Sequence, residues 1–453
     1  MGEDKLKHKK RELPDFGSTS IWKLIFRLAP PVMAAQLIQA LYNIIDSFFI
    51  GRYSDTGLTA LSIVYPLQLL MIALGVGTGV GINTAMSFFN GLHKKSHARD
   101  AAGMAAPLAV IMWVLFAAVF GALMPLYASL STSSPAVIDD VVTYGRIVCV
   151  FSLGLFTESV WTKVLQAEGK MKLPMAAQIL GAVVNIVLDP LLIFGFGAIP
   201  ELGIAGAAVS TVAGQTVAAL VVMFGGCRKP PKLKVFGKYT ARIYHMGMPN
   251  ILMQAAYTFY IFGLELILSG FSDQAVTVLG LYYKWQTFFF IPLGALQTCI
   301  VPVISYNYAQ GSYDRCRSVL KDSFIAGALL MSLGTLCFEF LPAQLIAAFS
   351  SDPLVMSIGV TGFRIIGISF IPMVSSLIFP VFFQAVGSAL KSSLLTVIRT
   401  VLLFVPLGLI FSLFGLDMFW LTYPVTEVLT SAVGFVFYSR FGKTRQNDRD
   451  TFN

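Results

Sequence analysis

The sequence predicts an all-α membrane protein of twelve transmembrane helices, arranged as two six-helix bundles related by a pseudo-two-fold parallel repeat. Three observations support this fold class. Of the 453 residues, 56% are hydrophobic and only 12% are charged, whereas a soluble protein carries about 25% charged residues. Apolar runs long enough to span a bilayer recur along the chain, and its second half repeats the first at a fixed offset. The five cysteines and four histidines are scattered and indicate neither a disulfide framework nor a zinc site.

Twelve apolar runs reach the length that a membrane helix requires, about 20 residues. They lie approximately at residues 28–51, 58–89, 101–127, 138–166, 174–196, 203–224, 243–269, 275–308, 320–348, 354–386, 392–414 and 418–438. Runs near 30 residues are expected to tilt or to extend beyond the hydrocarbon. Residues 21–27 mix aromatic, aliphatic and basic side chains, so we expect a short amphipathic helix in the interface.

The connections between these runs predict orientation. Nearly all loop Lys and Arg residues fall on one side of the membrane, and the opposite side contains only Arg52. By the positive-inside rule the basic side and both termini are cytoplasmic, in the cell (inner) membrane. The first twenty residues are polar and charged, unlike a cleaved signal peptide. The net charge of +9 therefore reflects topology and affinity for anionic lipid, and predicts no nucleic-acid partner.

The expected organisation has five parts. They are a cytoplasmic N-terminal tail with the interfacial segment (1–27), an N-lobe of six spans (28–224), a cytoplasmic linker (225–242), a C-lobe of six spans (243–438) and a cytoplasmic C-terminal tail (439–453).

Adding 218 to a position in the first half leads to a matching residue in the second. Pro31 matches Pro249 and Arg146 matches Arg364, with almost no gaps across more than 150 residues. Six spans in each half is an even number, so both halves have the same orientation and form parallel repeats. Two such bundles that face each other across a central cleft predict an alternating-access transporter.

Polar residues line one face of the first span. Gln36, Gln39, Asn43 and Asp46 are three, four and three residues apart, so they share a helical face. A carboxylate inside a span is costly and is retained only where it faces protein or water, usually on an ion or substrate path. We therefore expect a functional site around Asp46. A polar seam that joins this helix to a neighbour is the alternative.

The fifth span carries a second acid on a polar face. Gln178, Gly181, Asn185 and Asp189 are three, four and four residues apart. Asp46 lies about 7–8 Å, and Asp189 about 10 Å, from the outer end of its helix, so both lie at similar depth. Two neighbouring carboxylates in a low dielectric cannot both stay ionised at low cost.

Such a pair can hold a proton, or it can coordinate Na⁺ together with Asn185 and a hydroxyl of Ser210 or Thr211 on the sixth span. For Asp189, followed by Pro190, a helix-end cap before a turn is the alternative.

Other charged residues lie inside predicted spans. Glu265 shares a face of the seventh span with Gln254, so both are candidates to line a substrate cavity. Glu158 and Glu427 lie deeper, and each either pairs with a buried polar group or lines the cleft. Lys284 is positioned to neutralise Glu265. On the first span, the candidates to line the cavity are Gln39, Tyr42 and Asn43.

Several segments together resemble the multidrug and toxic-compound extrusion (MATE) family. They are YNIIDSFFIG with the upstream Pro31, LQAEGKMKLPM, NIVLDPLLIFGFG, GIAGAAVST and PVISYNYAQG. The resemblance extends from about Trp22 to Arg440. It implies twelve helices in two lobes, and export of cationic amphiphilic compounds in exchange for H⁺ or Na⁺.

The DNA-damage-inducible F-like branch resembles this chain most closely. In that branch the residues that couple transport to the cation match Asp46, Asn185, Asp189 and Thr211, which would also hold a Na⁺. The proline that kinks the first helix matches Pro31. The other prokaryotic branch uses C-lobe acids in the seventh, eighth and tenth spans. Here the eighth span offers Lys284 and the tenth has no acid at mid-depth.

The sequence therefore predicts a secondary active multidrug efflux antiporter. It would act on small cationic or amphiphilic molecules as a monomer, with no cofactor beyond the coupling ion. A flippase for polyprenyl-linked sugars is the nearest alternative, although its cleft should be lined with Arg and Lys. A non-transporting membrane receptor or scaffold is a third, which the repeat and the intramembrane acids disfavour. No nucleophile–base or metal constellation indicates an enzyme.

Overall fold

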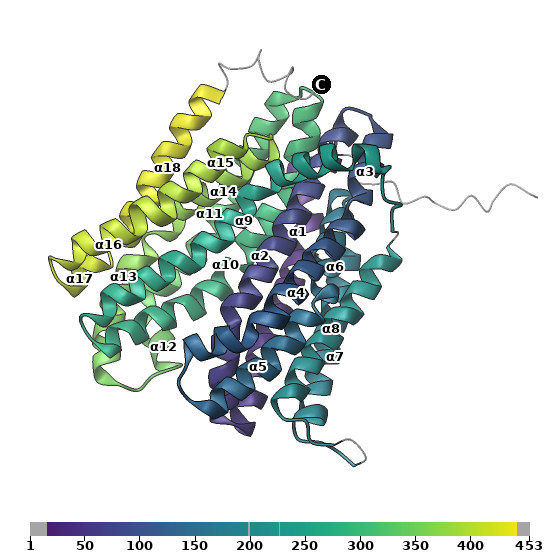
Figure 1. Ribbon diagram of the computed structural model, residues 1–453. Coiled ribbons are helices and arrows are strands. Elements are labelled where there is room, and N and C mark those ends of the chain that lie inside the picture. Colours follow the sequence, from purple (N-terminus) through teal and green to yellow (C-terminus); the bar gives the residue numbers. More distant parts are fainter. Residues whose placement is uncertain (1–15, 198–199, 226, 442–453) are drawn as a thin grey trace, which may run out of the picture.

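The structure, a computed structural model, describes residues 16–197, 200–225 and 227–441. Figure 1 shows helices packed as two neighbouring bundles, the first half of the chain in purple through blue to teal and the second in green to yellow. The helices of the first half are α1 (Ile21–Tyr53), α2 (Asp55–Gly91), α3 (Lys95–Gly103), α4 (Ala105–Ser131), α5 (Pro135–Val150), α6 (Leu153–Ala167), α7 (Lys172–Ile193) and α8 (Ile204–Phe224).

The second half contains longer helices and one π-helix, η1. Its elements are α9 (Leu233–Ser269), α10 (Asp273–Ala309), α11 (Tyr313–Phe340), α12 (Pro342–Ala347), α13 (Pro353–Gly367), α14 (Phe370–Ala385), α15 (Ala389–Val397), η1 (Ile398–Phe404), α16 (Val405–Ser412), α17 (Leu416–Phe419) and α18 (Thr422–Phe441). The predicted all-α membrane fold is confirmed.

Within the described residues, nine helices are long and apolar enough to cross a membrane, or ten if α13 and α14, bent by 54°, form one span. The other two predicted spans correspond to α5 with α6, and to α18. Two predicted spans, 138–166 and 354–386, are each divided into two helices. At each break a serine hydroxyl donates to the carbonyl three residues earlier, Ser152 to Cys149 and Ser369 to Ile366. Such local hydrogen bonds compete with the helical ladder.

The repeat seen in the sequence is also present in the structure. α2 and α10 both have 37 residues, and their bounds differ by 218 at each end. The side chains of Ser54 and Ser272 cap these two helices in the same way, each accepting a hydrogen bond from a backbone N–H three residues later. Equivalent arginines also make equivalent contacts, because Arg146 Nε donates to the Gly121 carbonyl and Arg364 Nε to that of Glu339. The halves are thus structural repeats, including details that hydropathy does not specify.

The first turns of α1 differ from expectation. Residues 21–27 do not form a separate interfacial helix but continue into the first span, and Leu24 and Leu28 are each only 2% exposed. They pack, with Phe16, into the hydrophobic core of the second half. Arg315 of α11 fixes this segment further by donating to the backbone carbonyl of Phe16. Similarly, α9 begins at Leu233, so the second part of the expected linker is already helical.

The two halves are packed closely at the end that carries most of the basic loops, which the sequence predicts to be cytoplasmic. A Cβ atom at Gly81 of α2 would lie 2.1 Å from the Ile243 carbonyl oxygen, and one at Gly247 of α9 would lie 2.4 Å from that of Gly77. The Ser305 hydroxyl of α10 donates to the Thr84 carbonyl at 3.0 Å. Only glycine permits such backbone contact, so this end of the interface is closed.

Candidate ion-coupling and cargo site

Two glycines allow α7 and α8 to cross in backbone contact. A Cβ at Gly181 would lie 2.7 Å from the Gly214 carbonyl oxygen, and a Cβ at Gly214 would lie 2.6 Å from that of Gly181. Small residues at such crossings are typical of membrane helices. As a result, the polar face of α7 meets the hydroxyl groups of α8.

Asp189 lies eight residues beyond Gly181 on α7 and is completely buried. Its Oδ1 accepts hydrogen bonds from the Ser210 hydroxyl of α8 and from Asn185 Nδ2 at 3.4 Å. The same Asn185 amide also donates to Thr211 Oγ1 at 3.5 Å. Three residues predicted from sequence to couple the cation (Asn185, Asp189 and Thr211) therefore lie in one network, together with Ser210.

Asp46 of α1 completes the cluster from the opposite side. It is 7% exposed, and its carboxyl group is close enough to that of Asp189 for the two charges to interact. Two buried carboxylates that interact repel each other, which favours neutralisation of at least one of them. Three buried oxygens nevertheless have no donor among the described residues: Asp46 Oδ1, Asn185 Oδ1 and Asp189 Oδ2. Buried oxygens without donors call for a proton, an ion or water.

A cavity of about 400 Å³ inside the first bundle reaches this network. Asn185 and Thr211 line it, together with Gln39 and Tyr42, two of the residues predicted to face a cavity. The third candidate from α1, Asn43, has a side chain outside the part of the structure that is described. One polar cavity therefore connects this network with the face of α1 that carries Gln39 and Tyr42.

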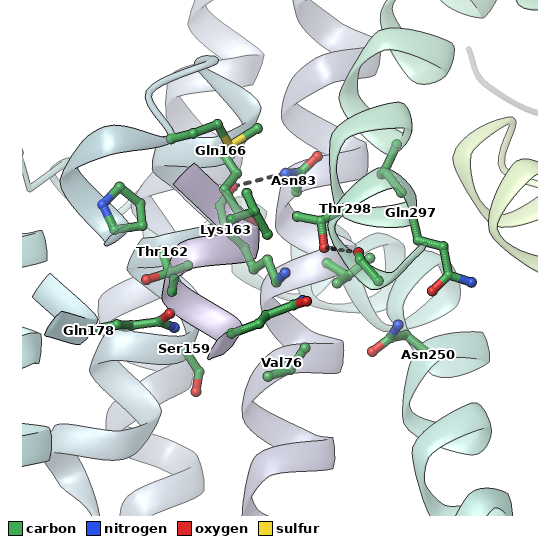
Figure 2. Close-up of a pocket in the computed structure, with 18 of the residues that line it drawn as sticks. Val76, Asn83, Ser159, Thr162, Lys163, Gln166, Gln178, Asn250, Gln297 and Thr298 are labelled. Atoms are coloured by element: carbon green, nitrogen blue, oxygen red, sulfur yellow. Dashed lines mark hydrogen bonds between the residues drawn. The ribbon is translucent and has the colours of Figure 1, made fainter. Parts of the chain in front are cut away.

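A central cavity of about 340 Å³ lies between the two bundles, and Figure 2 shows part of its lining. Pro31 and Gln36 of α1 face it, as do Glu158 and Lys163 of α6. Most of the remaining polar lining is carboxamide, contributed by Asn83, Gln166, Gln178, Asn250, Gln254, Gln297 and Gln384. Its volume falls within the range of about 300–1,000 Å³ that is usual for small-molecule sites.

The second bundle contains a buried ion pair beside a third cavity, of about 270 Å³. Arg399, on the π-helix η1, binds Glu427 of α18 through Nη2–Oε1 at 2.6 Å and through Nε to both carboxylate oxygens. Ser376 also donates to Glu427. The guanidinium lies over the Phe404 ring at 5.0 Å. This carboxylate is therefore fully partnered, unlike the acids of the first bundle.

Comparison with known proteins decides the family. The sequence profile named MatE matches residues 31–191 and 249–410, two segments that begin 218 residues apart. The chain belongs to the MatE family. MatE proteins are membrane transporters and not enzymes, and their solved structures have twelve helices in two bundles. The predicted family and the internal repeat are thus confirmed, although the match does not distinguish branches of the family.

Individual relatives are distant but cover nearly the whole chain. A Shewanella oneidensis protein called "FAD transporter" is 24% identical over 91% of this chain and 93% of its own length. "Multidrug export protein MepA" of Staphylococcus haemolyticus is 22% identical, with 95% and 96% covered. A structure described as the outward-facing conformation of a multidrug resistance MATE family transporter superposes with a TM-score of 0.87 at 21% identity, covering 95% of this chain and 98% of the other.

The remaining candidate residues of this MatE protein differ in whether they line a cavity or make the contact expected of them. Gln254 lines both the central cavity and the cavity of the second bundle. Glu265 is half-buried and lines none of the three cavities described above. Lys284 does not pair with Glu265 within 4.0 Å; its amine lies 5.1 Å from the centre of the Phe349 ring. Pro31 lies inside α1, which continues through Pro30 and Pro31 as one helix.

The sequence left two roles open for Glu158 and Glu427, namely pairing with a buried group or lining the cleft, and the two residues differ in this respect. Glu427 is paired, whereas Glu158 lines both the central cavity and the cavity of the first bundle. Glu158 Oε1 accepts from Thr162 at 2.8 Å and from Gln178 at 3.2 Å.

Sequence reasoning missed Lys163 and Arg399, although both lie within predicted spans, 138–166 and 392–414. The rule that flagged the intramembrane acids applies equally to bases.

Proposed function

We propose that this MatE protein is a secondary active multidrug efflux antiporter, which exports cationic amphiphilic compounds in exchange for H⁺ or Na⁺ by alternating access. The observation that carries the proposal is the buried Asp46–Asp189 pair, in which one oxygen of each carboxyl group has no donor among the described residues, beside a cavity large enough for cargo. The relative named as a multidrug export protein supports the same class of activity. We place the transporter in the cell (inner) membrane as a monomer, with both termini cytoplasmic and lobes at residues 28–224 and 243–438.

The coupling step follows from charge neutralisation. With the cytoplasmic end closed, the acid pair takes up H⁺ or Na⁺ from outside, which removes the repulsion between the two carboxylates. Pro30 and Pro31 remove two backbone donors from α1, so this helix bends more easily there than elsewhere. Bending or repacking of α1 narrows the cavity of the first bundle and displaces the cargo.

The driving force is adequate for efflux. One elementary charge that crosses 100 mV is worth about 2.3 kcal/mol, and about 1.4 kcal/mol corresponds to a tenfold concentration ratio. A single ion can therefore support a gradient of several tens-fold in an uncharged cargo. A monovalent cation exchanged one for one moves no net charge, so its export is driven by the concentration gradient of the ion. To complete the cycle, the closed end must open, which requires separation at Gly77 and Gly81 of α2.

A flippase for polyprenyl-linked sugars is the second candidate. Two basic residues, Lys163 and Arg399, do line cavities, as a pyrophosphate carrier would need. However, Glu427 neutralises Arg399, and Glu158 shares the central cavity with Lys163. The cavities therefore carry no excess of positive charge, which favours the exporter.

Asp46→Asn tests the proposal. In a pump-deficient bacterium, wild-type protein should lower ethidium accumulation, and Asp46→Asn and Asp189→Asn should each abolish this effect at equal membrane abundance. Asp139→Asn is the matched control, because Asp139 is exposed on α5 and should export normally. Undiminished efflux by Asp46→Asn would refute the coupling assignment. Wild type that transports a lipid-linked sugar but not ethidium would favour the flippase, and transport of neither would favour a scaffold.

The ion is identified in proteoliposomes. Varying Na⁺ at fixed pH, and then pH at fixed Na⁺, should show dependence of ethidium transport on one of the two gradients.

A further inference from the structure

Glu158 lies where the cavity of the first bundle meets the central cavity. It lines both cavities, and in the described part of the chain it is the only ionisable residue common to the two linings. The antiport cycle loads the ion at Asp46 and Asp189, but it assigns no carboxylate to the release of that ion into the cytoplasm. The position of Glu158 therefore raises the question of the release path.

Glu158 lies between the acid pair and the closed end of the interface. Asp189 is seventeen residues beyond the first residue of α7, Lys172, and is therefore about 25 Å from that end of the helix. Glu158 is nine residues before the last residue of α6, Ala167, and is therefore about 13–14 Å from the same end, because a short turn joins α6 to α7. A cation that moves inward from Asp189 passes Glu158 about halfway.

One polar face of α7 connects the two positions. Gln178 Nε2 donates to Glu158 Oε1 at 3.2 Å, and Asn185, two turns further along, donates to Asp189 Oδ1 at 3.4 Å. Gln178 and Asn185 both line the cavity of the first bundle, as does Gly181 between them. Their amide oxygens can bind a cation or a bridging water, so this face supplies polar groups along the whole step.

The carboxylate of Glu158 is only partly satisfied. Both hydrogen bonds that it receives, from Thr162 at 2.8 Å and from Gln178, go to Oε1. Oε2 accepts none from the described residues, and none of their basic side chains lies within 4.0 Å of the carboxylate. A half-buried carboxylate inside a span with a free oxygen attracts a proton, a cation or water.

Lys163, five residues further along α6, is close enough to Glu158 for their charges to interact, but the two form no ion pair within 4.0 Å. Figure 2 shows the lysine side chain extending from the helix between Thr162 and Thr298. A Cβ atom at Gly79 of α2 would lie 2.7 Å from Lys163 Cγ, so this glycine leaves room for the aliphatic part of the lysine. The packing of α2 and α6 thus holds a basic group near Glu158 without direct pairing.

The other titratable groups around this position are uncharged near neutral pH. Tyr42 of α1 and Tyr65 of α2 line the cavity of the first bundle, and Cys299 of α10 is close enough to Lys163 to interact with it. Tyrosine and cysteine side chains are mostly uncharged at pH 7. Among the described residues, Lys163 is therefore the charge that opposes a cation at Glu158.

We propose that Glu158 is a transit site for the coupling cation on its way from the Asp46–Asp189 pair to the cytoplasm, and that Lys163 competes with this cation for the carboxylate. The inference rests on the proposed function, because it assigns the release step of the same antiport cycle. Asp46 and Asp189 have no basic partner among the described residues, whereas the amine of Lys163 weakens cation binding at Glu158. When the closed end opens, the ion leaves Glu158 and Lys163 again balances the carboxylate.

Carbodiimide labelling tests the site without transport. Dicyclohexylcarbodiimide reacts with protonated carboxyl groups in apolar surroundings, and peptide mass spectrometry of the purified full-length protein in uncharged detergent gives the labelled fraction at Glu158. Lys163→Met, close in size but uncharged, should increase this fraction several-fold at pH 7, because a repelling charge is removed. Lys163→Arg should label like wild type.

Lys284→Met is the matched control for labelling, because Lys284 is exposed and lines none of the three cavities. It should leave the labelled fraction at Glu158 unchanged. Retained ethidium binding shows that Lys163→Met is folded. An unchanged labelled fraction in folded Lys163→Met would overturn the proposal.

Transport kinetics separate ion transit from cargo binding. In proteoliposomes with an imposed pH gradient, and then with an imposed Na⁺ gradient, Glu158→Gln should lower the maximal rate of ethidium transport at least about tenfold, while ethidium binding in detergent stays unchanged. Glu158→Asp keeps the charge and should recover part of the rate. A normal maximal rate in Glu158→Gln, or a loss confined to ethidium binding, would overturn the transit role.

A double variant separates competition from an independent structural effect. Lys163→Met should also slow transport, because the ion leaves Glu158 more slowly. Combined with Glu158→Gln, it should cause no further loss, since the carboxylate for which it competes is gone. Additive losses in the double variant would refute the competition.

Failure of this inference can be distinguished from failure of the proposed function. If Lys163→Met raises the labelling but wild type does not transport ethidium, the antiport proposal fails and the transit role fails with it, while the cation site at Glu158 stands. If wild type transports ethidium in response to an ion gradient but Lys163→Met labels like wild type, the antiport proposal stands and the transit site is excluded.

Discussion

Removing one partner of the Arg399–Glu427 pair should destabilise the second bundle strongly. Glu427 is fully buried and Arg399 is 6% exposed, so Glu427→Gln leaves a guanidinium in the protein interior without its counter-charge. Breaking a buried ion pair in this way costs about 3–5 kcal/mol. For a large chain about 1 kcal/mol corresponds to about 2 °C in Tm, so Tm should fall by about 6–10 °C. Thermal unfolding in detergent, followed by tryptophan fluorescence, measures this change.

Arg399→Met should lower Tm more than Glu427→Gln does. Arg399→Met loses the ion pair and also the contact of the guanidinium with the Phe404 ring, which is worth about 0.5–2 kcal/mol. Glu427→Gln keeps that contact. The double variant Arg399→Met/Glu427→Gln removes both charges and should recover part of the lost Tm, because replacing a whole buried pair is often nearly neutral.

An exposed pair provides the control. Arg317 and Asp314 lie 3.5 Å apart with 54% and 98% of their side chains exposed. Such surface pairs contribute about 0–1 kcal/mol, so Asp314→Asn should change Tm by no more than about 2 °C. The reasoning would be refuted if Glu427→Gln were as harmless as Asp314→Asn, or if the double variant were less stable than both single variants.

Two further predictions concern the closed end and the acid pair. Gly81→Val should separate the bundles at the closed end, since even its Cβ would overlap the neighbouring backbone. Maleimide labelling of Ser305→Cys, at a position that is buried in wild type, should then increase several-fold. Gly280→Val, where a Cβ meets nothing within 4 Å, should leave it unchanged, and equal labelling in both would contradict the closure. Ser210→Ala removes one donor from Asp189. Ethidium efflux should therefore fall about tenfold or more, while Tm should be nearly unchanged. Normal efflux by this variant would exclude a role for the hydroxyl.

Features set by spacing along one helix could be predicted from the sequence. Hydropathy and the repeat fix helix number and order, because the bilayer leaves few alternatives for an apolar run of this length. The depths of Asp46 and Asp189 follow from the helical rise of about 1.5 Å per residue, which is why their proximity was predictable. The contact of Asp189 with Ser210 also follows, since the sixth span must return beside the fifth.

Features that depend on how different helices face one another could not be predicted. Arg399 and Glu427 are 28 residues apart on separate helices, and no sequence period links them. The position of the Lys163 amine depends on Gly79 of a helix that is distant in sequence. The first turns of α1 were misjudged because their apolar face packs into the second bundle and not into lipid. In each case the deciding contact is tertiary.

Equivalent helices of the two halves surround a buried carboxylate, but only the second half supplies a basic side chain to pair with it. By the repeat offset, α15–α16 and α18 are the counterparts of α7 and α8, and Arg399 corresponds to Gly181. In the second bundle the positive charge that satisfies the carboxylate is covalently attached and cannot leave. In the first bundle the glycine at that position supplies no charge, and Asp46 and Asp189 have no basic partner within the described residues. A carboxylate can exchange an external cation only where the chain supplies none, so this asymmetry supports coupling in the first bundle alone.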